Sequence, residues 1–239
     1  MNTIPFKKGK VLVIAHRGLS GIEKENTTSA FVAAGNRSYY GIETDIHRTS
    51  DGYFVINHDM TLERVAGVNI NVEENPLSAL QEVILMDKDG TKDRFDLRPC
   101  ILQDYLKICK KYEKHCVLEL KSKFTDEEIE KIINIIKEFD YLDNTTFISF
   151  KYDNLLKVRK VLPNHSVQYL VDMITDEVIK KVTADRIDID VEQSDLTQEK
   201  LKRIHDAGLK VNCWTVDRIE DAERLAEWGV EYITTNILE

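Results

Sequence analysis

The chain has 239 residues, of which 33 are basic and 42 acidic, so its formal net charge at pH 7 is −9. This balance argues against a nucleic-acid-binding protein and against a general attraction to anionic membranes. The four cysteines show no metal-ligand spacing, and with no signal peptide and no apolar run long enough to span a bilayer, we expect a cytoplasmic protein without stable membrane insertion.

Strands and helices are expected to alternate along most of the chain, because short β-branched or apolar runs are followed by amphipathic stretches with helical spacing. Thr125 and Glu128 form a predicted capping box at the start of one helix, and Gly208 is typical of a helix end. In chain order we predict strands at 11–15, 41–46, 116–120, 146–150, 167–170, 187–190, 210–215 and 231–234, and helices at 26–35, 125–139, 152–161, 176–182, 197–207 and 219–228.

Eight such strands in a chain of this length predict a (β/α)8 TIM barrel. An open doubly wound sheet is the alternative, but the chain has no Gly-rich dinucleotide-binding loop. Ser50-Asp51-Gly52 predicts a tight turn after the second strand, and a returning arm at 53–57 would complete a β-hairpin. Residues 60–97 lack sustained periodicity, so we interpret them as a small insertion within a single barrel domain spanning 1–239. The insertion could cover the substrate or be a loop without a role in function.

The predicted hairpin contains the first residues that indicate a chemical function. Glu43 and Asp45 are two residues apart in a strand, so their side chains point to the same face. Two carboxylates held close together are unfavourable unless a cation or a proton neutralises one of them. The returning arm brings His58 to the same region, which favours a metal site with a nearby acid or base over a solvated strand face.

Other strand ends add to this set, because barrel enzymes place their reactive residues at the carboxyl ends of the strands. Glu119 brings a third carboxylate, and three carboxylates suit a hard divalent cation, Mg²⁺ or Ca²⁺. Arg17 and Lys121 add positive charge to the same rim, which suits a phosphate group whose charge shifts during a reaction.

Two histidines complete the predicted site. His16 and His58, with an ordinary pKa of about 6.5, can serve as general base and general acid on opposite sides of a phosphorus atom. The combination points to phosphodiester hydrolysis. Taken singly, the residues have structural explanations: His16 as a packed histidine, Glu119 and Lys121 as an ion pair, Trp214 as core. We expect four other histidines to be structural or solvated: His47, His115, His165 and His205.

Six short segments follow one another along the chain: His16-Arg17-Gly18, Glu43-Thr44-Asp45, His58-Asp59, Glu119-Leu120-Lys121, Ser149-Phe150 and Trp214-Thr215-Val216. In this order, and over essentially the whole chain, they resemble the motifs of the glycerophosphodiester phosphodiesterase family. Lys24 stands where the family's PENT-type segment usually has proline, and the segment 233–237 lacks a proline that is common in the family; both departures affect loop rigidity more than chemistry. The family's HRG, ExD, HD, ELK, SF and WTV motifs correspond to residues 16–18, 43–45, 58–59, 119–121, 149–150 and 214–216.

The resemblance implies a hydrolase that uses one divalent cation, Mg²⁺ or Ca²⁺, to cleave glycerophosphodiesters to sn-glycerol 3-phosphate and an alcohol. It also implies a role for each motif residue, with Asn26 helping to order the first loop. By position, Glu43, Asp45 and Glu119 would bind the metal, His16 and His58 would form the acid/base pair, Arg17 and Lys121 would contact the phosphate, and Phe150 and Trp214 would pack against the glycerol or the alcohol.

Two other functions fit the same residues. One is a relative that acts as a lysophospholipase D or a phosphoinositide phospholipase, and the other is a non-catalytic barrel that binds phosphorylated ligands. Paired acid/base groups weigh against pure binding, which does not require them. The sequence leaves open which histidine is the acid, and whether water attacks directly or a glycerol hydroxyl first forms a cyclic phosphate. It also leaves open the alcohol group and the oligomeric state.

Overall fold

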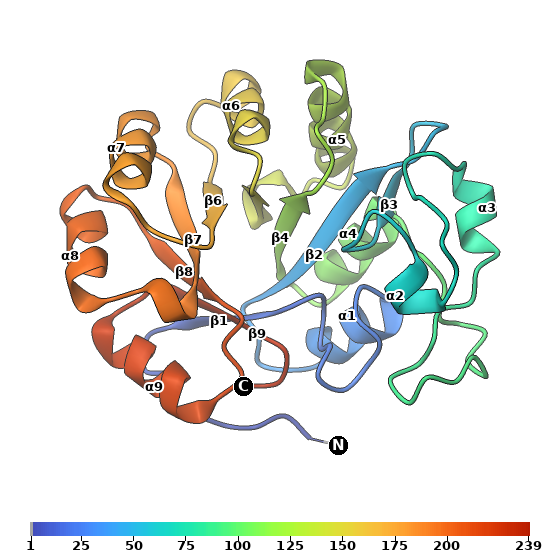
Figure 1. The fold of residues 1–239 in the computed structure, drawn as a ribbon, viewed down its shortest axis with the longest axis horizontal. Coiled ribbons are helices and arrows are strands. Elements are labelled where there is room, and N and C mark those ends of the chain that lie inside the picture. The colour runs from blue at the N-terminus through green and yellow to red at the C-terminus, as the bar shows by residue number, and fades with distance from the viewer. Residues whose placement is uncertain (1) are drawn as a thin grey trace.

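Eight parallel strands close into a barrel in the computed structural model, which describes residues 2–239. Neighbouring strands follow the order β1-β9-β8-β7-β6-β5-β4-β2, and pairing of β1 with β2 closes the ring. The predicted TIM barrel is therefore confirmed (Figure 1). The barrel strands are β1 (Leu12–Ala15), β2 (Gly41–Arg48), β4 (His115–Leu120), β5 (Thr145–Ser149), β6 (Val167–Val171), β7 (Asp188–Glu192), β8 (Val211–Trp214) and β9 (Tyr232–Thr235).

The predicted hairpin is also present, because β3 (Phe54–Ile56) pairs antiparallel with the end of β2. Gly52 has a φ of +80° in the connecting turn, a conformation that favours glycine. The turn is held by a hydrogen bond from the Gly52 N–H to the Thr49 carbonyl oxygen at 3.0 Å. Just after β3, the Asn57 N–H donates to the Asp45 carbonyl oxygen at 3.2 Å. The hairpin thus fixes the segment that carries His58 next to β2.

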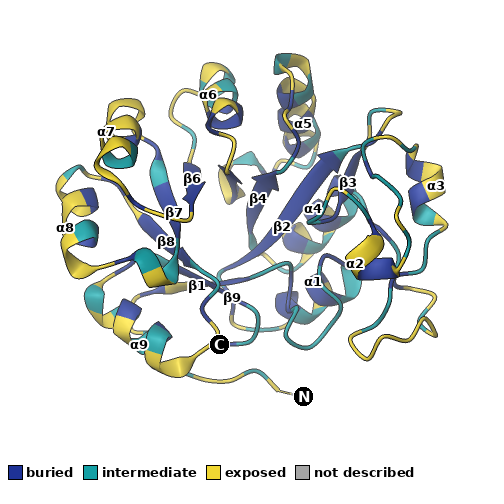
Figure 2. Ribbon diagram, in the orientation of Figure 1, coloured by how far each residue is buried: buried dark blue, intermediate teal, exposed yellow. Residues whose placement is uncertain are grey.

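Helices surround the barrel, with their buried faces towards the strands and their exposed faces outward (Figure 2). α5 begins at the predicted capping box: the Thr125 hydroxyl oxygen accepts from the Glu128 N–H at 3.2 Å, and the Glu128 carboxylate accepts from the Thr125 N–H at 2.8 Å. The outer helices are α1 (Thr28–Gly35), α4 (Leu102–Lys111), α5 (Asp126–Glu138), α6 (Tyr152–Val161), α7 (Asp176–Asp185), α8 (Gln198–Asp206) and α9 (Ile219–Trp228), and the short 3₁₀ helices are η1 (Leu142–Asn144) and η2 (Gln193–Asp195).

Two helices differ from the expectation. α1 begins at Thr28 rather than at Asn26, because Asn26 has a φ of +56° and cannot continue a helix. α4 was not among the predicted helices, although Leu102, Tyr105 and Cys109 have helical spacing and are fully buried. The irregular segment before α4 hid this pattern. With α4 in place, every parallel connection from β2 to β9 carries a helix.

Residues 60–97 lie beside β3 at one side of the barrel (Figure 1, right). They contain the short helices α2 (Glu63–Ala66) and α3 (Leu77–Gln81) and pack an apolar cluster of their own against Val55 of β3. Arg94 donates to Glu23 at 2.7 Å, which ties the segment to the β1–α1 loop. The segment is therefore fixed on two sides, by apolar packing and by charge.

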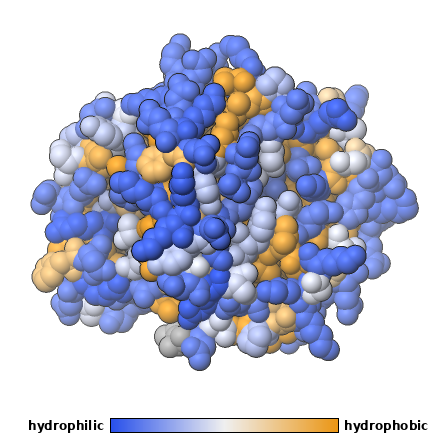
Figure 3. All heavy atoms as spheres, turned by 180° about the vertical axis from the view of Figure 1, so that it is seen from behind, coloured by the Kyte–Doolittle hydropathy of each residue, from blue (hydrophilic) through white to orange (hydrophobic). Residues whose placement is uncertain are grey.

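Polar side chains cover most of the face seen from behind, and apolar residues appear there in separate patches (Figure 3). Within residues 2–239, no helix combines the length and the apolar character that crossing a bilayer requires.

Candidate active site

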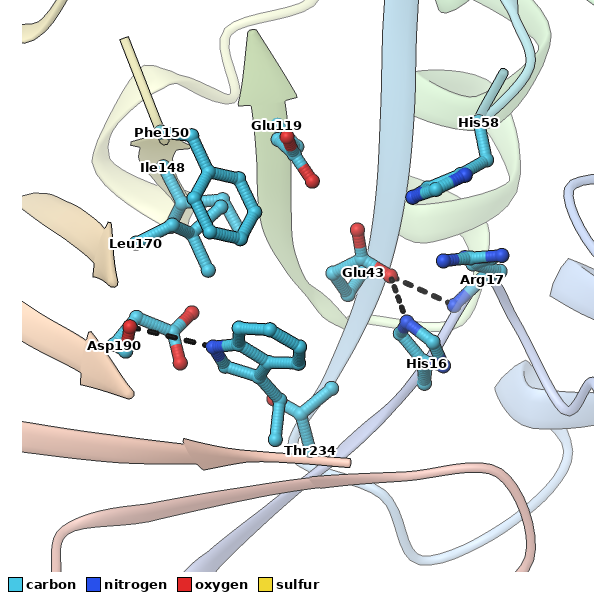
Figure 4. Close-up of a pocket in the computed structure, with 11 residues that line it drawn as sticks. His16, Arg17, Glu43, His58, Glu119, Ile148, Phe150, Leu170, Asp190 and Thr234 are labelled. Carbon is cyan, nitrogen blue, oxygen red and sulfur yellow. Dashed lines mark hydrogen bonds and ion pairs between the residues drawn. The ribbon is translucent and has the colours of Figure 1, made fainter. Parts of the chain in front are cut away.

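A cavity opens at the carboxyl-terminal side of the barrel strands. Each of the eight barrel strands contributes a side chain to the lining, either from within the strand or from the residues that follow it. The lining residues are His16, Arg17, Glu43, His58, Glu119, Ile148, Phe150, Leu170, Asp190, Trp214 and Thr234 (Figure 4). Of the remaining residues expected in the site, Asp45 and Lys121 lie directly beside Glu119.

Glu43, Asp45 and Glu119 form a buried carboxylate cluster at one side of the cavity. Each offers an oxygen within 4.8 Å of the other two, since Asp45 on β2 is the register partner of Glu119 on β4. Burial and the Asp45 charge raise the pKa of Glu43 well above its ordinary value and the pKa of Glu119 to about 8. Asp45 Oδ1 is buried without a hydrogen-bond partner. Crowded oxygen donors with an unpartnered atom fit one hard divalent cation.

Two positively charged side chains, Arg17 and Lys121, flank Asp45. Arg17 Nε lies 3.5 Å from Asp45 Oδ2, while Lys121 Nζ lies 3.7 Å from Asp45 Oδ1 and 3.0 Å from Glu119 Oε1. Burial on its own would raise the pKa of Asp45, but these two charges hold that pKa below its usual value. Arg17 Nε is itself buried without a hydrogen-bond partner. Fixed positive charge with an available donor gives the cavity a place for an anionic group.

His16 is held by the loop that follows β9. Asn236 Nδ2 donates to Asp217 Oδ2 at 2.6 Å, so the amide oxygen of Asn236 faces His16 Nδ1, 2.8 Å away. An amide oxygen only accepts, and therefore the Nδ1 atom of His16 carries the proton. Nε2 is left unprotonated, 4.0 Å from Glu43 Oε2. Burial and the neighbouring Arg17 charge lower the pKa of His16 to about 4, which keeps the ring neutral at pH 7.

His58 is held in the same way by a carboxylate. Its Nδ1 lies 2.7 Å from Asp59 Oδ1, and Arg64 Nε donates to Asp59 Oδ2 at 2.7 Å. Arg64 also donates through both terminal nitrogens to Glu25, at 2.7 and 2.9 Å, and Glu25 accepts from Arg17 at 2.9 Å. Burial lowers the pKa of His58. Both histidines thus present an unprotonated Nε2 to the cavity.

The opposite side of the cavity is largely apolar. Phe150 after β5 and Trp214 on β8 meet edge to face, with ring centroids 5.7 Å apart. Ile148 and Leu170 line the same wall. Asp190 on β7 is the only ionisable residue from β5 to β9 among the described residues that line the cavity.

Several residues make contacts at the site that were not expected from the sequence. Asn26 was expected only to order the first loop, yet its amide also donates to Asp45 Oδ2 at 2.8 Å. Arg64 and Glu25 contact each other across 39 residues of sequence, and no local pattern signals that contact. Asp190 did have a local signal in the sequence. Isoleucine and aspartate alternate in the run 187–190, so Asp190 points to the face opposite the isoleucines.

Comparisons with known proteins agree with this geometry. The model of the glycerophosphoryl diester phosphodiesterase family matches residues 16–239. A glycerophosphodiester phosphodiesterase of Caldanaerobacter subterraneus subsp. tengcongensis is 29% identical over 230 residues, which cover 95% of this chain and 94% of the relative. An uncharacterized Bacillus subtilis protein, YqiK, is 29% identical over 234 residues, 95% of each chain.

Among solved structures, an Oleispira antarctica phosphodiesterase in complex with the product sn-glycerol-3-phosphate superposes with a TM-score of 0.86 and 25% identity, covering 94% of this chain and 92% of that one. The family model spans all the motif residues from His16 onward. This chain therefore belongs to the glycerophosphoryl diester phosphodiesterase family.

Proposed function

We propose that this protein hydrolyses glycerophosphodiesters to sn-glycerol 3-phosphate and an alcohol, with one divalent cation, Mg²⁺ or Ca²⁺, held by Glu43, Asp45 and Glu119. The family assignment and the product bound to the Oleispira antarctica relative support this reaction. The crowded carboxylates and the unpartnered Asp45 Oδ1 support the cation. When bound, the cation would supply positive charge to the phosphate oxygens.

One observation carries the proposal: His16 and His58 each have Nδ1 tied to an acceptor and Nε2 free at the same cavity. A free Nε2 can take a proton from an attacking hydroxyl group, whether of water or of the glycerol. The second histidine, once protonated, can give a proton to the leaving alkoxide. An anionic phosphodiester between the rings would favour that protonated state.

The remaining residues bind and orient the substrate in this proposal. Arg17 and Lys121 would hold the phosphate, since each combines a fixed charge with hydrogen-bond donors near the carboxylate cluster. Phe150 and Trp214 would pack against the organic part of the substrate, opposite the charged residues. The phosphorus would then lie between the histidines, and the carbon chain would extend towards the aromatic pair.

Release of glycerol 3-phosphate tests the proposal directly. Purified protein with Mg²⁺ or Ca²⁺ is incubated with glycerophosphocholine, glycerophosphoethanolamine, glycerophosphoglycerol and glycerophosphoinositol, and the product is measured by an enzyme-coupled assay. We expect release from at least one substrate, and loss of release after treatment with EDTA. No release from any of the four with either cation would reject the proposal.

Lysophosphatidylcholine serves as the matched comparison substrate. Choline release from it, without activity on the four water-soluble diesters, would favour a lysophospholipase D instead. Binding of a glycerophosphodiester without turnover in either assay would favour a non-catalytic phosphate-binding barrel.

A further inference from the structure

Asp190 is a buried acid that the proposed chemistry does not use. It lies at the middle of β7, is 1% exposed, and lines the cavity between Leu170 on one neighbouring strand and Asn212 on the other. Figure 4 shows its carboxyl group pointing from β7 into the barrel. Buried polar side chains are expected to have partners, so an acid in this position requires an explanation.

Asp190 Oδ1 has no hydrogen-bond partner. Among the described residues that line the cavity, buried unpartnered polar atoms occur only at Arg17 Nε and at Asp190 Oδ1. The first lies beside the carboxylate cluster, where a phosphate accounts for it. The second lies across the cavity, where the neighbouring lining residues Ile148 and Leu170 are apolar.

Other polar groups on this side of the cavity are already engaged. The Thr234 hydroxyl and the Asn212 side chain hydrogen-bond each other at 3.0 and 3.2 Å, and Trp214 Nε1 donates to the Asp190 carbonyl oxygen at 3.3 Å. That last contact also fixes the Trp214 ring over β7. A ligand that reaches this wall therefore finds one vacant polar position, next to an aromatic ring.

We propose that the Asp190 carboxyl group binds a hydroxyl group of the glycerol part of the substrate and so selects glycerol over an unsubstituted alkyl chain. This assignment rests on the proposed function, because it takes the phosphate to lie between the histidines and the carboxylate cluster. A three-carbon polyol attached to that phosphate places hydroxyl groups a short distance away, towards the opposite wall.

The environment suits a hydroxyl group better than a cation. Burial raises the pKa of Asp190 to about 8, so at pH 7 the group is mainly an uncharged carboxylic acid. A carboxylic acid offers one donor and one acceptor, and a hydroxyl group offers the same pair. A charged headgroup such as an ammonium would instead require an ionised partner in this apolar surrounding.

Two ligands that differ only in their hydroxyl groups test the proposal. sn-Glycerol 3-phosphate and n-propyl phosphate are titrated calorimetrically in the presence of Mg²⁺ into the wild type, Asp190→Val and Asp190→Asn. The wild type should bind sn-glycerol 3-phosphate roughly 10-fold more tightly than n-propyl phosphate. Asp190→Val should bring the two affinities together, whereas Asp190→Asn, whose amide also offers a donor and an acceptor, should keep most of the difference.

Thermal unfolding separates binding from a structural role. Asp190→Val removes an unpartnered buried polar group, so its melting temperature should equal or exceed that of the wild type. If this variant does not fold, Asp190→Ala provides the same comparison at smaller volume.

Equal discrimination in the wild type and in Asp190→Val would overturn the proposal, and so would a wild type that does not discriminate. If those results come from a wild type that still hydrolyses glycerophosphodiesters, only the role of Asp190 fails. A wild type that neither hydrolyses them nor binds sn-glycerol 3-phosphate would overturn the proposed function and the Asp190 assignment together.

Discussion

The two sides of the cavity differ in how their polar groups are held. On the side of β1, β2 and β4, charged groups contact one another: Arg17 and Lys121 flank Asp45, and Arg64 joins Glu25 to Asp59. On the side of β5 to β8, an aromatic pair and aliphatic side chains enclose one acid. The difference teaches that a single barrel rim can separate a charged side, which suits an anionic group, from an apolar side, which suits an organic group.

If this division is right, substitutions on the charged side should mainly lower kcat or metal affinity, and substitutions on the apolar side should mainly raise KM. The largest effect is expected at the histidines. His16→Ala or His58→Ala should lower kcat by about 100-fold or more, because each removes a positioned proton carrier. Steady-state kinetics on the best glycerophosphodiester substrate measures this.

The matched control is His205→Ala, since His205 is exposed on α8. It should keep wild-type kcat and KM. Circular dichroism should show that all three variants are folded. A His58→Ala enzyme within a few-fold of wild-type kcat would remove His58 from the acid/base pair.

The second effect concerns the cation. Glu119→Gln keeps the size of the side chain but removes one charged ligand, so the affinity for Mg²⁺ or Ca²⁺ should fall by more than about 10-fold. Calorimetric titration of the EDTA-treated protein measures the affinity without relying on turnover. Glu227→Gln, an exposed position on α9, is the control that should bind as the wild type does. An unchanged affinity in Glu119→Gln would exclude Glu119 from the ligand set.

The third effect tests positioning from a distance. Arg64 touches neither the cavity nor the carboxylate cluster, but it holds Asp59, which orients His58. Arg64→Ala should lower kcat by roughly 10-fold with little change in KM, because the substrate-binding groups remain while the His58 ring loses its fixed orientation. Arg94→Ala is the matched control, since Arg94 ties the same insertion to Glu23 without reaching a histidine. Equal losses in both variants would mean that Arg64 only supports the insertion.

The fourth effect lies on the apolar side. Phe150→Ala should raise KM by about 3- to 10-fold and leave kcat nearly unchanged, because removing one aromatic contact costs on the order of 1 kcal/mol. Leu156→Ala on α6 removes an apolar side chain of similar exposure away from the cavity and should change neither constant. A large fall in kcat for Phe150→Ala would show that the two sides of the cavity do not divide binding from chemistry.

Much of this arrangement could be predicted from the sequence. The alternation of strands and helices can be recognised from local patterns, and barrel enzymes place their reactive residues at the carboxyl ends of the strands. Alternation within β2 places Glu43 and Asp45 on one face, and parallel register then brings Glu119 beside them. The contacts of Arg64 with Glu25 and of Asn236 with His16 could not be predicted, since they join loops from distant strands and depend on loop geometry. Helix α4 could have been predicted from its spacing, but the irregular segment before it obscured where the helix begins.

The smallest expected effect concerns stability at low pH, at the end of β4 that lies away from the cavity. Activity at neutral pH should not change. His115, at the end opposite Glu119, stacks on Tyr40 with ring centroids 5.1 Å apart and contacts Thr146. Burial lowers its pKa to about 4 from 6.5, so between these pH values the unfolded chain binds a proton that the folded chain does not. The contribution of His115 to stability should therefore fall by about 3 kcal/mol as the pH drops from 6.5 to 4 and change little below that. Urea unfolding across this range should show a weaker pH dependence in His115→Gln and an unchanged one in His205→Gln. The same slope in all three proteins would place the acid sensitivity elsewhere, first at His16, whose pKa burial also lowers to about 4.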